Sequence, residues 1–193
     1  NKKNAKNRNV KYARVQAWCG VPVTTTTTPA PEPCAEKETV VAAHAPVPLS
    51  DMAETMYAAP GVGLAAPQVS DSRRLVVIDS EAGEGGGTRL RKFANPTIVE
   101  RSKESIFWRE TCLSVPDLEV EVERARRIMV RWSDPLNGET KEETFEGYEA
   151  VIVQHELDHL DGTILLARTS RFKRSRYIKR VKKLRRQVSV EVS

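Results

Sequence analysis

Three residues near the end of the chain have the types and the spacing of a hydrolytic metal site. The segment VIVQHELDHLDG, residues 151–162, arranges His155, Glu156 and His159 in the pattern H-E-x-x-H. On a helix, residues four apart share a face, so both imidazoles can bind one ion while Glu156 lies beside them as a base. The alternative is a pair of core or solvent-facing histidines, which is weaker because the chain contains only three histidines.

The motif supplies two metal ligands and one base, so a third ligand has to come from elsewhere. A metzincin has a third His six residues after the second, but position 165 is Leu. A thermolysin-like site takes a Glu from a following helix, but the only glutamate after His159 is Glu191, close to the chain end. The third ligand is therefore expected upstream, where Cys112, His44 and the carboxylates are the candidates.

Cys112 is favoured among these candidates because it ends an ordered-looking strand, ETCLSVP, whereas His44 lies in a proline-rich approach. A Cys/His/His set leaves a fourth position for water and suits Fe(II), Zn(II), Co(II) or Ni(II). The alternative for Cys112 is a buried structural thiol.

The elements that must hold these residues follow from periodicity and turn residues. They are a short helix at 49–60, strands at 75–79, 92–100 and 106–116, a hairpin within 118–147 that turns at DPLNGE, and a helix at 147–162. One helix, many strands and a second helix predict an α+β fold, with mixed or antiparallel sheets around a central metal-binding helix and a basic helix at the C-terminus.

The composition divides the chain into three parts. Residues 1–48, with a Thr run and several prolines, predict a flexible low-complexity segment, and residues 49–170 have the texture of a catalytic domain. Residues 171–193 form a basic tail, and the stretch from Arg168 to Arg186 holds eleven Lys and Arg and no acid. The absence of acids before Glu32 weakly resembles a transit peptide.

Cysteine use and hydropathy bear on the compartment. Three scattered cysteines are too few for a disulfide framework, which favours a reducing compartment. No apolar run reaches the roughly 18–20 residues of a membrane span, and no secretory signal is apparent. We expect a bacterial cytoplasmic protein, or one of a mitochondrial or plastid matrix, without a membrane or DNA partner.

The segment GVGLAAPQ, residues 61–68, superficially echoes a dinucleotide-binding pattern. That pattern needs a strand before the glycines and a helix after them, and the predicted order here is the reverse. The segment instead indicates a backbone that comes close to another group, with Gln68 as an amide donor. A tight turn packed by small residues is the alternative.

Taken together, GVGLAAPQ, ETCLS and QHELDHLDG resemble the three signature segments of the peptide deformylases. Members of that family remove the formyl group from the N-terminal methionine of new chains, so N-formylmethionyl peptides are the implied substrates. The resemblance covers roughly residues 49–170 and implies one divalent ion, Fe(II) natively, with Zn(II), Ni(II) or Co(II) also working. The implied roles are metal binding by Cys112, His155 and His159, acid/base catalysis by Glu156, oxyanion binding by Gln68 and the Leu113 N–H, and substrate binding by Val62, Gly63, Val151 and Ile152.

The basic tail has two interpretations. It places apolar residues at near-helical spacing among Lys and Arg, which is typical of an amphipathic helix docked on the sheet. The resemblance instead suggests a helix that binds ribosomal RNA or protein, with a steep salt dependence.

Two alternative functions stay open. One is a general zinc endopeptidase. The other is a catalytically weak relative that mainly binds ribosomes or RNA, because Thr111 replaces the Gly that usually precedes the cysteine in the family. A β-branched residue is poorly suited to a positive-φ position, so Thr111 would perturb the placement of Cys112 if that backbone is required.

Overall fold

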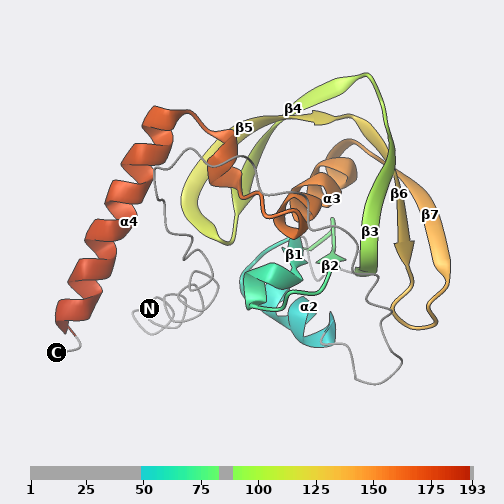
Figure 1. Ribbon diagram of the computed structural model, residues 1–193, viewed down its shortest axis with the longest axis horizontal. Coiled ribbons are helices and arrows are strands. Elements are labelled where there is room, and N and C mark those ends of the chain that lie inside the picture. Colours follow the sequence, from blue (N-terminus) through green and yellow to red (C-terminus); the bar gives the residue numbers. More distant parts are fainter. Residues whose placement is uncertain (1–48, 83–88, 192–193) are drawn as a thin grey trace, which may run out of the picture.

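The structure is a computed structural model that describes residues 49–82 and 89–191 (Figure 1). The helices are α2 (Leu49–Ala58), α3 (Gly147–Leu160) and α4 (Arg171–Glu191), with short 3-10 helices η1 (Ala66–Val69) and η2 (Leu165–Arg168). The strands are β1 (Gly63–Ala65), β2 (Leu75–Ile78), β3 (Arg91–Arg101), β4 (Ser105–Cys112), β5 (Val115–Ala125), β6 (Arg127–Ser133) and β7 (Thr140–Glu146).

The strands form two antiparallel sheets around α3. One sheet has five strands in the order β1-β2-β3-β6-β7, and β4 pairs with β5 in a separate two-stranded sheet. Helix α3 contacts strands of both sheets, and β4 and β5 arch over it while β1 and β2 lie beneath it (Figure 1). The predicted α+β fold with a central helix is therefore confirmed.

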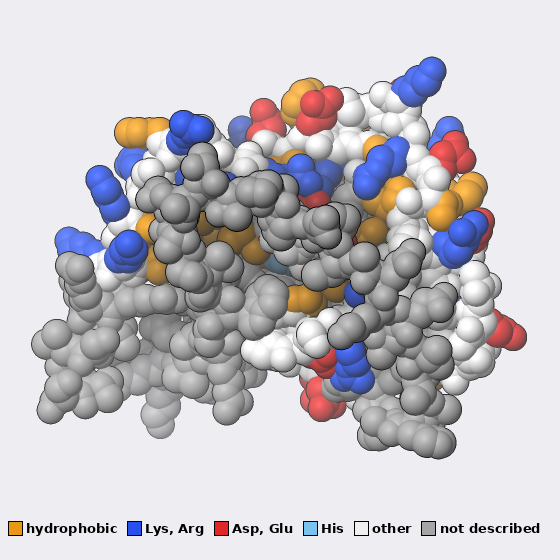
Figure 2. All heavy atoms as spheres, in the orientation of Figure 1, with side chains coloured by type: hydrophobic (Ala, Val, Ile, Leu, Met, Phe, Trp, Pro, Cys, Tyr) orange, Lys and Arg blue, Asp and Glu red, His pale blue; other side chains and the backbone are white. Residues whose placement is uncertain are grey.

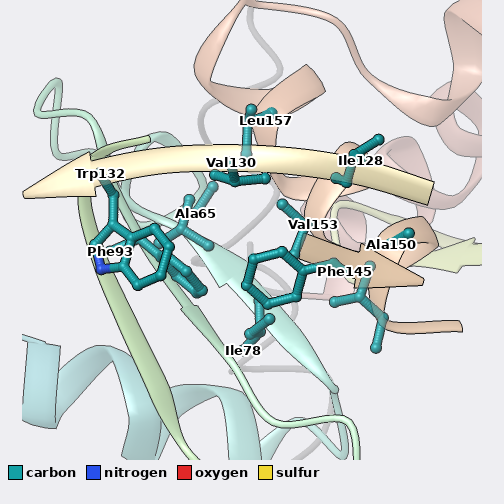
Figure 3. Close-up of a cluster of buried hydrophobic side chains, with 12 residues drawn as sticks. Ala65, Ile78, Phe93, Ile128, Val130, Trp132, Phe145, Ala150, Val153 and Leu157 are labelled. Atoms are coloured by element: carbon teal, nitrogen blue, oxygen red, sulfur yellow. The ribbon is translucent and has the colours of Figure 1, made fainter. Parts of the chain in front are cut away.

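The main core lies between α3 and the five-stranded sheet (Figure 3). Ala150, Val153 and Leu157 follow each other at helical spacing and pack against aromatic side chains of the sheet. Phe93 and Trp132 meet edge to face, with ring centroids 4.9 Å apart. Because this apolar side of α3 faces the large sheet, other faces of the helix are left for β4, β5 and the candidate ligands.

Glycines mark both ends of α3, as the sequence predicts. Gly147 has a φ of +59° and Gly162 has a φ of +74°, conformations that L side chains rarely adopt. The Gly147 N–H donates to the Arg126 carbonyl over 2.9 Å, which ties the start of the helix to the end of β5.

Helix α4 extends away from the sheets toward the C-terminus (Figure 1). Tyr177 is half-buried against a small cluster that includes Cys112 and Leu165, and Arg180 pairs with Asp117 of β5 over 3.1 Å, so the first half of α4 is attached to the small sheet. The predicted basic helix is confirmed, whereas the predicted character of residues 1–48 lies outside the described residues. None of the helices described is long and apolar enough to span a membrane.

Candidate active site

The three predicted metal ligands converge beneath β4. The Cys112 sulfur and the nearest ring nitrogens of His155 and His159 all lie within 4.8 Å of one another. Sγ of Cys112 is 3.2 Å from Nε2 of His159, which is 3.3 Å from Nε2 of His155. Ligand atoms around one tetrahedral ion are roughly 3.3–3.6 Å apart at ordinary Zn–N and Zn–S distances. The donor set therefore fits a single ion.

Burial and neighbouring charges act differently on the two histidines of this pocket. Burial, followed by repulsion from His155, lowers the pKa of His159 to about 3, so this ring is neutral and its lone pair is available. Burial opposes the charged form of His155, but contacts with Cys112 and Glu110 outweigh it and raise the pKa to about 10. Positive charge is therefore disfavoured on His159 and favoured on His155.

Glu110 fixes the orientation of the His155 ring, and the sequence analysis missed it. His155 donates from Nδ1 to Oε2 of Glu110 over 2.8 Å, which leaves Nε2 to face the other ligands. Burial favours the neutral acid, but bonds from Arg124 and His155 lower the pKa of Glu110 to about 2. The signal was available, because residues two apart on a strand share a face and Glu110 is two before Cys112.

Glu156, the predicted base, is a buried carboxyl group with charged neighbours. Only 4% of the residue is exposed, and its Oε2 is the one buried side-chain oxygen without a hydrogen-bond partner among the described residues. Burial, followed by repulsion from Glu110 and Asp158, outweighs the attraction of His155 and Arg124 and raises its pKa to about 7. A carboxyl group with this pKa can both accept and donate a proton near neutral pH.

Gly63 lies against this carboxylate. A Cβ added to Gly63 would lie 2.4 Å from Oε1 of Glu156 and 2.8 Å from Cδ. The glycine is therefore required by the close approach of β1 to α3, since its φ is not in the left-handed region.

Gln68 is held by bonds from both ends of its amide. Its Oε1 accepts from the Ala65 N–H over 2.8 Å, and its Nε2 donates to Oγ of Ser114 over 3.0 Å. A primary amide has two N–H donors, so one remains for another acceptor. Ser114 was not predicted as a site residue, although it stands two positions after Cys112 in the ETCLS segment.

Leu113 lies in the two-residue turn between β4 and β5. Cys112 pairs with Val115 across this turn, and the N–H group of Leu113 is outside that pairing.

Thr111 lies in β4 and pairs with Glu119 of β5. It is exposed, and its φ is not positive. The positive-φ backbone at which Thr111 would perturb Cys112 is therefore absent, and a β-branched residue suits this strand position, where the β4–β5 register shifts between Thr111 and Cys112.

Comparison with known proteins identifies the family. The sequence model of the Polypeptide deformylase family matches residues 32–175. A peptide deformylase of Desulfotalea psychrophila is 46% identical over 157 residues, which is 79% of this chain and 92% of the relative. The chain belongs to the peptide deformylase family. It is a deformylase-type enzyme, a hydrolase with a metal-binding site.

Solved deformylase structures have the same fold. A peptide deformylase from Legionella pneumophila is similar with a TM-score of 0.64 at 37% identity, covering 73% of this chain and 80% of that one. A class I type b peptide deformylase from Acinetobacter baumannii bound to Met-Ala-Ser is similar with a TM-score of 0.57 at 40% identity, covering 63% and 79%.

The residues expected from the sequence to bind substrate differ in their surroundings. Val151 is buried and precedes His155 by one turn, whereas Ile152 belongs to the main core and half-buried Val62 packs against it. The rings of Trp108 and Tyr148, which the sequence did not single out, stack with centroids 5.1 Å apart, and both residues are more than a third exposed.

Proposed function

We propose that the enzyme removes the N-formyl group from N-formylmethionyl peptides, with one divalent ion held by Cys112, His155 and His159. The observation that carries this proposal is the convergence of the three donors beside the unpaired, buried carboxylate of Glu156. A general zinc endopeptidase and a degenerate binding protein are not favoured, because the family match includes the catalytic segments and Thr111 is compatible with its strand.

Each step of the reaction is assigned to particular residues of the chain. When bound, the ion supplies Lewis acidity, which lowers the pKa of a water molecule and polarises a carbonyl oxygen. Glu156 accepts a proton from the attacking water and later donates it to the leaving amine, after which formate is released. The remaining Gln68 N–H and the Leu113 N–H stabilise the negative charge that develops on the formyl oxygen.

The substrate main chain lies along β1. This three-residue strand is at the edge of the five-stranded sheet and, among the described residues, pairs only with β2, so a peptide can add as a further strand on its other side. Gly63 lies at its start against Glu156, so a peptide paired with β1 would present its N-terminus near the acid.

The methionine side chain contacts Trp108 and Tyr148. Trp108 shares a face of β4 with Glu110 and Cys112, and Tyr148 precedes His155 by seven residues, two turns along the same face of α3. A thioether packs favourably against aromatic rings. The Met-Ala-Ser peptide in the Acinetobacter enzyme supports a methionine as the first residue.

Fe(II) is the proposed native metal, with Zn(II), Ni(II) or Co(II) as substitutes. One thiolate and two imidazoles suit all four ions, so the identity has to be measured. Since the similar relatives are bacterial, the proposed compartment is the bacterial cytoplasm, with an organelle matrix as the alternative.

An anaerobic assay combined with metal analysis on the same sample tests the function. The enzyme should release formate from a formyl-Met peptide and leave internal bonds of an unblocked peptide intact. Cleavage of the unblocked peptide would support the endopeptidase, and full metal content in Cys112→Ser would contradict the ligand set.

Ribosome binding by α4 is a separate proposal. Exposed Lys and Arg side chains gather over α4 (Figure 2), and Phe172 is 70% exposed. A Lys173→Ser/Lys179→Ser/Lys183→Ser variant should lose co-sedimentation with ribosomes while keeping formate release. Wild-type binding that does not weaken with salt would contradict a phosphate contact.

A further inference from the structure

The hydrogen bond between Glu110 and His155 is the inner end of a chain of ion pairs. Glu110 accepts from Nε of Arg124 at Oε1 over 2.7 Å and from Nη2 at Oε2 over 2.9 Å. Both side chains are almost fully buried, at 3% and 4% exposure. This two-point contact fixes the plane of the carboxylate that orients the His155 ring.

The outer half of the chain reaches the surface. Arg124 donates from Nη1 to Oδ2 of Asp158 over 2.7 Å. Arg168 binds the same carboxylate at two points, from Nε to Oδ2 over 2.8 Å and from Nη2 to Oδ1 over 2.6 Å. Arg124, Asp158 and Arg168 line a groove of about 540 Å³ on the side of α3 away from the ligands.

The charges alternate along the chain, so each group is balanced by its neighbours. The buried guanidinium of Arg124 faces two carboxylates, Glu110 and Asp158, and Arg168 supplies the second positive charge. Without Arg168, one guanidinium would have to balance both acids. Asp158 would then attract Arg124 more strongly, and the bonds that Arg124 makes to Glu110 would loosen.

We propose that Arg168 is a positioning residue of the metal centre, which acts through Asp158 and Arg124 on the Glu110 carboxylate that orients His155. This inference rests on the proposed ligand set. It also gives η2, the short helix between α3 and α4, a function in holding the site.

The rival explanation is that Arg168 only clamps η2 to α3. Arg74→Gln is a matched control, because Arg74 pairs with Asp161 at the same end of α3 over 2.9 Å and lines the same groove. The control removes a comparable arginine–aspartate pair that does not lead to His155. Both variants should therefore lose similar thermal stability.

The discriminating measurements are metal affinity by chelator competition and the visible spectrum of the Co(II)-loaded protein. Arg168→Gln should weaken metal affinity by roughly tenfold and shift the spectrum, while Arg74→Gln should change neither. Arg168→Lys should be intermediate, because it keeps the charge but loses the two-point contact.

A double-mutant cycle tests the route of the effect. In an Asp158→Asn background, Arg168→Gln should add little further loss of affinity. Native affinity and spectrum in folded Arg168→Gln would overturn the proposal, as would an undiminished effect in the Asp158→Asn background. If Arg168→Gln does not fold, native affinity in Arg168→Lys overturns it instead. Absence of metal binding by the wild type would contradict the ligand set, which is a distinguishable result.

Discussion

The buried carboxylate of Glu156 lowers the stability of the folded protein. Burial raises its pKa, and one of its oxygens has no partner among the described residues. Buried polar groups are usually paired, so an unpaired acid beside a metal-binding cluster indicates a group kept for chemistry.

Glu156→Gln should reduce formate release by about 10²–10⁴-fold, because the amide cannot accept and return a proton. Metal content should be unchanged, and the thermal midpoint should rise because a buried charge is removed. Formate assay, metal analysis and calorimetry on one sample check all three. Glu149→Gln on the same helix is the control, and near-native activity of Glu156→Gln would rule out the assigned role.

Gly63→Ala should displace the Glu156 carboxylate, since the added carbon would lie 2.4 Å from Oε1. Overpacking of this kind typically costs about 1–3 kcal/mol of stability, and kcat should fall because the acid is moved. Denaturant unfolding and the formate assay measure the two effects. In Gly63→Ala/Glu156→Asp the shorter acid should restore stability without activity, whereas native kcat in the single variant would contradict this explanation.

At the scale of elements, β4 sorts its residues by its period of two. Trp108, Glu110 and Cys112 lie on the face toward α3, while Phe107 and Thr111 lie on the exposed face. One face of the strand therefore carries an aromatic side chain (Trp108), the residue that orients His155 (Glu110) and a metal ligand (Cys112), in that order.

Trp108→Ala should raise KM for a formyl-Met peptide by roughly tenfold or more with a smaller change in kcat, because it removes apolar contact with the methionine side chain. Phe107→Ala is the matched control, since Phe107 is the adjacent aromatic on the opposite face and is 66% exposed. Steady-state kinetics with both variants decides the question. Equal effects of the two substitutions would remove Trp108 from the substrate pocket.

The metal centre joins two parts of the fold. Cys112 ends β4 in the small sheet, whereas His155 and His159 lie on α3, which packs on the large sheet. A bound ion therefore connects the two sheets through the central helix and should stabilise the folded chain as a unit.

Metal removal should lower the thermal midpoint. An ion at one hundred times its Kd stabilises by about 2.7 kcal/mol, which corresponds to about 5–10 °C for a protein of this size. Anaerobic calorimetry with and without a chelator measures the shift, and Cys112→Ser should show much less of it. An unchanged midpoint in the wild type would contradict binding at this site.

Much of the site could be predicted because its signals are local. The spacing of His155 and His159 specifies one helical face, and Gly162 specifies where that helix ends. No third metal ligand of a known type follows His159, which favours an upstream ligand such as Cys112, and the three segments together indicate the family.

Other features depended on contacts between segments far apart in the sequence. The backbone conformation of Thr111 is set by the pairing of β4 with β5, which no local pattern specifies. The chain from Glu110 through Arg124 and Asp158 to Arg168 joins β4, β5, α3 and η2.

Local patterns in the sequence were enough to predict the ligand types, the base and the family, because residues within one turn or one strand carry these signals. The side chains that support them follow only from the packing of the fold. Gly63 meets Glu156 across 93 positions of sequence, and the ion pairs behind His155 span four elements. Such contacts form only when the sheets close around α3, so they follow from packing and not from any local pattern.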